Sequence, residues 1–198
     1  MISILGRTVA LLLIFGVALY AVLGYLLAPM GALVHPQMRE AFIGNAQAIY
    51  VHVFAASVAM ALGPFQFIAG IRTRHPRLHR WLGRIYLVVG VLIGGTAGLY
   101  IARDAFGGPV SVLGFTLLAL LWLYTGYRAY ATVRRGNFGG HRNWMVRNYA
   151  LTLAAVTLRL YVPLSVVAGL EFGKAYPIIA WLCWVPNLAL AEWRFIRR

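Results

Sequence analysis

Acidic residues are scarce in this sequence. Only four of the 198 residues are acidic, namely Glu40, Asp104, Glu171 and Glu192. A hydrolase that uses two carboxylates needs both of them in one site, and proton-coupled transporters usually place Asp or Glu inside their spans. All four acids lie near the ends of the predicted helices, so the first class is excluded and the second is disfavoured.

Cysteine is almost as rare. Cys183 is the single cysteine, so the chain has no disulfide framework and no Cys-x-x-Cys metal site. The sequence also lacks a Walker loop, a Gly-x-Ser-x-Gly elbow and a His-Glu-x-x-His motif. These absences remove the common motif-bearing enzyme classes, and the sequence does not decide whether the protein is an enzyme.

Apolar residues make up 62% of the chain and charged residues only 11%, with a mean hydropathy of +0.77. A helix needs about 20 mainly apolar residues to cross a bilayer. The composition therefore predicts an all-α, polytopic membrane helix bundle of about six transmembrane helices, with residues 1–198 in a single transmembrane domain. The predicted spans are residues 8–27, 42–71, 81–101, 110–131, 144–170 and 176–190.

Basic residues are distributed unequally between the two sides of these spans. Fourteen Arg fall on one side, whereas Arg39, Arg103 and Lys174 fall on the other. Because Lys and Arg accumulate on the cytoplasmic side, we expect both termini in the cytoplasm and the protein in the bacterial inner (plasma) membrane. The net charge of +14 is then explained by topology and lipid headgroups, and no nucleic-acid partner is expected.

Two loops on the arginine-rich side share a pattern of His-Arg, an aromatic residue, a second Arg and a Tyr. Both precede helices, whose amino-terminal dipoles favour anions. The pattern fits three interpretations: anchoring at the headgroup level, a grip on a phosphate or carboxylate, or coordination of a metal or haem iron by the two histidines. The residues of this first candidate site are His79, Arg80, Arg84, Tyr86, His141, Arg142, Arg147 and Tyr149.

A second candidate site lies within the bilayer. His52 and Arg159 are each about ten residues, or roughly 15 Å, from the outer ends of their helices, so they should lie at similar depth. Asn148 and Thr152 share the face of Arg159 by helical spacing. His52 alternatively bonds a neighbouring helix, and Arg159 snorkels or pairs with Asp104, Glu40 or Glu171. A charge inside a membrane is costly, which favours a functional role for Arg159.

Glycine recurs at four-residue spacing in the third span, at Gly90, Gly94 and Gly98. Such a ridge of small residues lets a neighbouring helix approach closely. The ridge predicts tight helix packing, and it also offers a contact face for an oligomer.

Three segments together resemble a bacterial membrane family catalogued as domain of unknown function 2306. They are Gly63-Pro64-Phe65-Gln66-Phe67, His79-Arg80 with Gly83-Arg84-Ile85-Tyr86, and His141 to Arg147 with Thr157-Leu158-Arg159. The resemblance covers roughly His52 to Tyr161 and implies no established activity. A looser similarity is to b561-type membrane cytochromes, which hold haem between histidines on facing helices. His79 and His141 resemble one such pair, and the fourth span has no His for a second.

Three functions follow from these patterns. The first is electron transfer by bound haem b or a quinone, with His79 and His141 as iron ligands and His52 and Arg159 in a second, outward pocket. The second is transport or binding of a small anionic or lipid-like solute, with Arg159 as the counter-charge. The third is a structural or assembly role in a larger membrane complex. Membrane lipids are the expected partners of all three.

Overall fold

Helices make up the fold of the computed structural model, which describes residues 4–196. No strand occurs in that range. Five helices are long and apolar enough to cross a membrane, so the predicted all-α membrane helix bundle is confirmed. These spans are Ile4–Leu27, Ala46–Gln66, Pro76–Ala102, Gly108–Arg134 and Phe138–Val167.

Three spans are single helices and two are composite. The single ones are α1 (Ile4–Leu27), α3 (Ala46–Gln66) and α7 (Gly108–Arg134). The third span joins α5 (Pro76–Ile85), the π-helical η2 (Tyr86–Ile93) and α6 (Gly94–Ala102), and the fifth joins α8 (Phe138–Thr152) and α9 (Ala154–Val167). Short helices connect the spans: η1 (Pro36–Met38), α2 (Arg39–Gly44) and α4 (Ala69–Arg74).

The sixth predicted span is interrupted. It consists of α10 (Phe172–Leu182), α11 (Val185–Ala191) and the π-helical η3 (Glu192–Ile196), with a break at Cys183 and Trp184. Pro186 lies at the start of α11, and a proline ring clashes with the carbonyl four residues earlier, which belongs to Leu182. The prediction of one continuous helix over residues 176–190 is therefore wrong, because proline ends α10.

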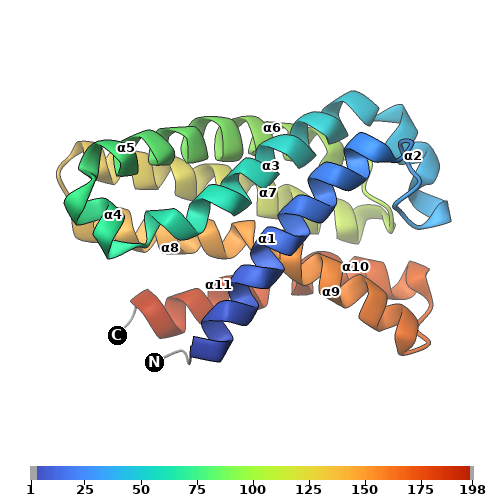
Figure 1. Cartoon of the computed structure of the whole chain (residues 1–198). Coiled ribbons are helices and arrows are strands. Elements are labelled where there is room, and N and C mark those ends of the chain that lie inside the picture. Colours follow the sequence, from blue (N-terminus) through green and yellow to red (C-terminus); the bar gives the residue numbers. More distant parts are fainter. Residues whose placement is uncertain (1–3, 197–198) are drawn as a thin grey trace.

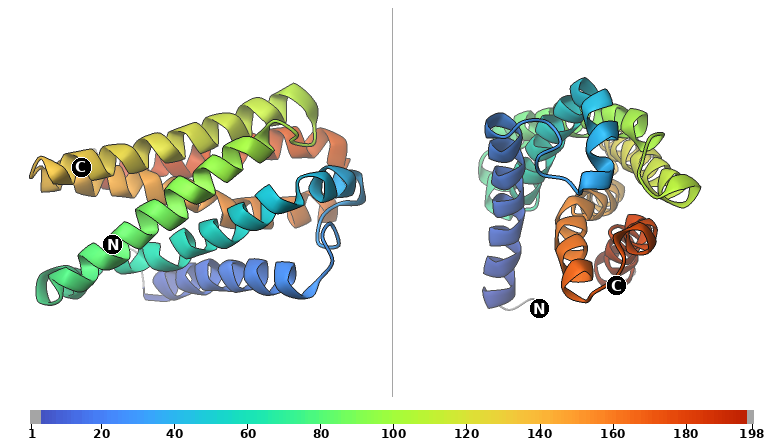
Figure 2. Two further views of the ribbon diagram at one scale, coloured as in Figure 1. Left: turned by 90° about the horizontal axis from the view of Figure 1, so that it is seen from above. Right: turned by 90° about the vertical axis from the view of Figure 1, so that its right-hand side faces the viewer.

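The connections between helices collect at two ends of the bundle. The α4–α5 and α7–α8 connections lie toward the same end as the start of α1 and the end of η3, whereas α2 and the α6–α7 and α9–α10 connections lie at the other (Figures 1 and 2). The arginine-rich segments 72–84 and 128–147 are thus brought to one end, as the base count requires. Which side of the membrane this end faces stays a prediction.

The glycine ridge packs against α3. A Cβ atom at Gly90 would lie 2.6 Å from the Ala59 Cβ and 2.9 Å from its Cα, and one at Gly94 would lie 3.2 Å from the Ala56 nitrogen. The predicted close approach of a neighbouring helix is confirmed, and that helix belongs to the same chain. Because α3 occupies the ridge, this face gives no support to an oligomer contact through Gly90, Gly94 and Gly98, which stays a prediction.

The carboxyl-terminal third diverges from the rest of the bundle. The helix breaks at Leu153 between α8 and α9, and α9 and α10 leave the direction of α7 and α8 (Figure 1). Helix α1 crosses the outside of the bundle at the point where this divergence begins (Figure 1). Because the helix breaks at Leu153, side chains of α8 and α9 that regular helical spacing would place on one face do not share a face.

Candidate intramembrane ligand site

A cavity of about 260 Å³ lies between α1, α3, α6, α7, α9 and α10. Its walls are mainly apolar and aromatic, and Ile49, Phe115 and Leu158 are examples. A few polar side chains from different helices also reach the wall. They are Tyr25, Asn45, His52, Asp104, Trp122, Thr152, Arg159 and Tyr176. The cavity thus brings His52 and Arg159 together, as their predicted depth requires.

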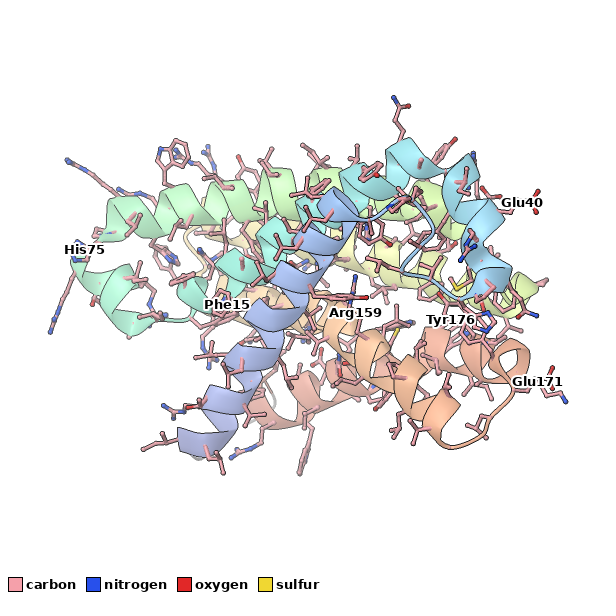
Figure 3. All side chains as sticks on the ribbon, turned by 45° about the vertical axis from the view of Figure 1, so that its right-hand side comes forward. Phe15, Glu40, His75, Arg159, Glu171 and Tyr176 are labelled. Carbon is pink, nitrogen blue, oxygen red and sulfur yellow. The ribbon has the colours of Figure 1, made fainter. Side chains whose placement is uncertain are left out.

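Arg159 has no carboxylate partner among residues 4–196. Its only hydrogen bond in that range runs from Nη1 to the carbonyl of Ala155, one turn earlier in α9, at 3.1 Å. Asp104 pairs with Arg103 (3.1 Å) and Glu171 with Lys174 (2.7 Å), while Glu40 is exposed. Figure 3 shows Glu40 and Glu171 at the end of the bundle, away from Arg159. The expected ion pair with Asp104, Glu40 or Glu171 is therefore wrong.

Two tyrosines and a histidine share the cavity with the guanidinium instead. They are Tyr25, Tyr176 and His52. A guanidinium carries five N–H donors, and the carbonyl of Ala155 accepts from one of its nitrogens. Arg159 therefore presents an uncompensated positive charge and spare donors to a largely apolar cavity.

His52 is oriented by the backbone of the neighbouring helix. Its Nδ1 lies 2.8 Å from the carbonyl oxygen of Gly94. A carbonyl oxygen only accepts, so Nδ1 carries the proton and Nε2 of the neutral ring is an acceptor. Gly98 makes room for the ring, since a Cβ there would lie 2.9 Å from Nδ1. His52 thus offers a fixed hydrogen-bond acceptor in the same cavity as the Arg159 donors.

Asn148 and Thr152 belong to a satisfied buried network. Asn148 is fully buried; its Nδ2 donates to the carbonyl of Trp122 (2.7 Å) and to Thr125 Oγ1 (2.8 Å), and its Oδ1 accepts from the Tyr86 hydroxyl (2.6 Å). Thr152 borders the cavity, but its hydroxyl accepts from the Trp122 indole (2.9 Å) and donates to the Asn148 carbonyl (3.0 Å). The expectation that Asn148 lies in the polar site is wrong, because its amide is fully used in helix packing.

His79 and His141 approach each other at the arginine-rich end. They come from α5 and α8, and His141 Nδ1 donates to the carbonyl of Ala129 at 2.8 Å. His79 Nδ1 is buried without a partner in the described part of the chain. Neither ring borders the cavity, so haem ligation by this pair stays a prediction that the His52 and Arg159 site does not support.

The tyrosines of the first candidate site are core residues. Tyr86 is fully buried and bonds Asn148. Tyr149 donates to the carbonyl of Met60 (3.2 Å), and its ring fills the space above Gly63, where a Cβ would lie 1.9 Å from it. Their expected place beside a cofactor at the helix entrance is wrong, because the helix turns both side chains into the bundle.

The arginines of the first candidate site have two different environments. Arg147 forms a two-point ion pair with Glu192, with Nη2 3.0 Å from Oε2, and lies 4.5 Å from the centre of the Trp144 ring. This pair ties α8 to η3. Arg80, Arg84 and Arg142 are exposed, which suits lipid headgroups.

The profile of a family described as "Predicted membrane protein (DUF2306)" matches residues 49–195. The chain belongs to this family. The match includes His52 and Arg159, and α1 lies outside it. The search of curated proteins found no match, and neither did the search of solved structures. Membership in DUF2306 therefore establishes a membrane protein without assigning a ligand or a reaction.

In this DUF2306 member, sequence reasoning missed Tyr25, Asn45, Trp122 and Tyr176 as polar residues of the cavity. Tyr25 comes from α1 and Tyr176 from α10, and no spacing rule connects these helices to His52. Asp104 lies at the mouth, where it accepts from Asn45 Nδ2 (3.2 Å) and from Arg103 Nε (3.1 Å). The hydrogen bond to Asp104 raises the pKa of Arg103, so Arg103 stays charged beside this carboxylate.

Proposed function

We propose that this protein binds a small organic anion inside the membrane, in the cavity between His52 and Arg159, and moves it across or presents it. The observation that carries the proposal is the unpaired guanidinium of Arg159. A charge of this kind costs at least about 2.5 kcal/mol at the centre of a bilayer, and no acid of residues 4–196 offsets it. An anionic ligand would supply the missing partner.

The interrupted last span supports transport. Transporters place their binding sites beside discontinuous helices, and the break between α10 and α11 occurs at Cys183, which borders the cavity. Trp184, the next residue, has a buried indole N–H without a partner in the described part of the chain. Asn187 spans the break by donating to the carbonyl of Cys183 at 3.0 Å. Because a side-chain hydrogen bond spans this break, the angle between α10 and α11 can change while both helices stay folded.

The other two functions fit the site less well. A neutral quinone has no negative charge to pair with Arg159. A haem held by His79 and His141 would lie outside the cavity. The glycine face suggested for assembly is filled by α3. An anionic solute uses both the charge of Arg159 and the apolar wall around it.

Thermal unfolding of the protein in lipid nanodiscs tests the proposal with octanoate, octylammonium and octanol as probes. The three share an apolar chain and differ in head charge. A ligand that binds only the folded state stabilises it by about 2.7 kcal/mol at one hundred times its Kd, so octanoate should raise the unfolding temperature and the other two should not. Equal shifts from all three would show partition into lipid and would reject an anion site.

A further inference from the structure

The cavity is small for an amphipathic ligand. Its volume of about 260 Å³ lies below the roughly 300 to 1,000 Å³ of pockets that enclose a drug-sized molecule. The lining beyond Arg159 is apolar and aromatic, with Phe42, Phe106 and Phe115 among the larger side chains. A long apolar chain attached to the bound head would therefore have to leave the cavity.

Helix α1 is the least buried of the five spans in residues 4–196, and it borders the cavity. Its buried residues are Ile14, Ala18 and Ala21, and two of these are small. It runs along the edge of the bundle (Figure 2) and contributes Tyr25 to the lining. Arg159 belongs to α9, which contacts α1. Helix α1 packs more extensively on α3 than on α9, so the contact between α1 and α9 is the weaker side of this wall.

The aqueous end of the cavity is less favourable for an anion. Asp104 borders it there and is joined to Asn45 by a hydrogen bond of 3.2 Å. The carboxylate repels an anion, although Arg103 partly neutralises it. The hydrogen bond between Asn45 and Asp104 also joins two segments at this end of the cavity, the one between α2 and α3 and the one between α6 and α7. The membrane side, which carries no acid, is the easier route for a negative head.

The head group has one cation on the cavity wall to pair with, Arg159. A carboxylate carries one negative charge and pairs with a guanidinium through two hydrogen bonds. A phosphate monoester carries about 1.5 to 2 charges at neutral pH, and Arg159 is the only Lys or Arg on the wall of the cavity in the described range. His52 Nε2 is an acceptor and adds no donor for further oxygens. The site thus fits a carboxylate better than a phosphate.

Resting on the proposed function, we propose that the ligand is a long-chain fatty-acid carboxylate that enters sideways from the bilayer between α1 and α9. Its carboxylate binds Arg159 while the end of its chain stays in lipid. Helix α1 moves aside for the head to pass and then covers it.

A comparison of chain lengths tests the ligand class in nanodiscs. Brominated octanoate and brominated hexadecanoate are titrated against the tryptophan fluorescence of the protein. The Trp122→Phe variant is the control, because it removes the contribution of the tryptophan that borders the cavity. With ligand concentration expressed as mole fraction in the lipid, both chains should quench with equal affinity. Loss of binding for hexadecanoate, with octanoate still bound, would overturn this inference and leave the proposed anion site intact. Failure of both acids would overturn the anion site itself.

A cross-link tests the route. The rings of Phe15 on α1 and Phe65 on α3 have centroids 6.3 Å apart, so Phe15→Cys and Phe65→Cys, in a Cys183→Ala background, place two thiols within reach of a short thiol-reactive linker. The linked protein should take up brominated hexadecanoate more slowly than either single-cysteine protein treated with the same linker. Equal uptake rates in all three would overturn access past α1.

Discussion

Arg159→Gln is expected to weaken octanoate binding strongly while folded protein still accumulates. Glutamine keeps hydrogen bonding and removes the charge. Hydrogen bonds to charged groups contribute about 1.5 to 3 kcal/mol, which corresponds to a loss of affinity of about 10- to 150-fold. Folding should tolerate the change, because within the described chain Arg159 bonds only a carbonyl of its own helix. Titration of octanoate into nanodiscs that carry the variant gives the affinity.

Two further variants make this result interpretable. Arg159→Lys keeps the charge and should retain part of the affinity, so it separates charge from fold if Arg159→Gln accumulates poorly. Arg134→Gln removes an exposed arginine at the other end of the bundle and should bind octanoate as the unmodified protein does. Wild-type affinity in Arg159→Gln would return Arg159 to a structural role.

Gly90→Ala should cause the largest loss of stability among the glycine variants of the ridge. The new methyl group would lie 2.6 Å from the Ala59 Cβ and 2.9 Å and 3.0 Å from its backbone Cα and nitrogen, so the helices themselves must separate. Overpacking of this kind costs about 1 to 3 kcal/mol. A lower unfolding temperature in detergent is the expected result. The separation should also disturb His52, which bonds Gly94 across the same interface.

Gly16→Ala is the matched control. Gly16 lies inside α1, and a Cβ there meets no heavy atom within 4 Å. Alanine has the higher helix propensity, so this variant should be at least as stable as the unmodified protein. Equal stability of Gly90→Ala and Gly16→Ala would contradict the close contact between α3 and η2.

Most of the architecture could be predicted because it depends on local chemistry. Hydropathy located five spans, and the four-residue glycine spacing identified the face of η2 and α6 that meets another helix. Pro186 was also visible in the sequence. Its effect was missed because apolar residues continue on both sides of it. Hydropathy measures how apolar a residue is and takes no account of the backbone N–H that proline lacks.

The polar site was only partly predictable. His52 and Arg159 share a cavity because depth in a membrane follows from counting residues along a helix. Asn148 was misplaced because helical phase was carried across Leu153, where the helix breaks. Tyr25 and Tyr176 depend on how α1 and α10 pack in three dimensions. Single-sequence patterns hold no information on that packing.

The contact between a ligand carboxylate and Arg159 is the central claim, and solid-state NMR measures it directly. Octanoate labelled with ¹³C at its carboxyl carbon and protein labelled with ¹⁵N in arginine would be combined in lipid. We predict a dipolar coupling between the carboxyl carbon and guanidinium nitrogens that disappears in Arg159→Gln and persists in Arg134→Gln. A coupling that survives Arg159→Gln, or its absence in the unmodified protein at saturating octanoate, would contradict the account.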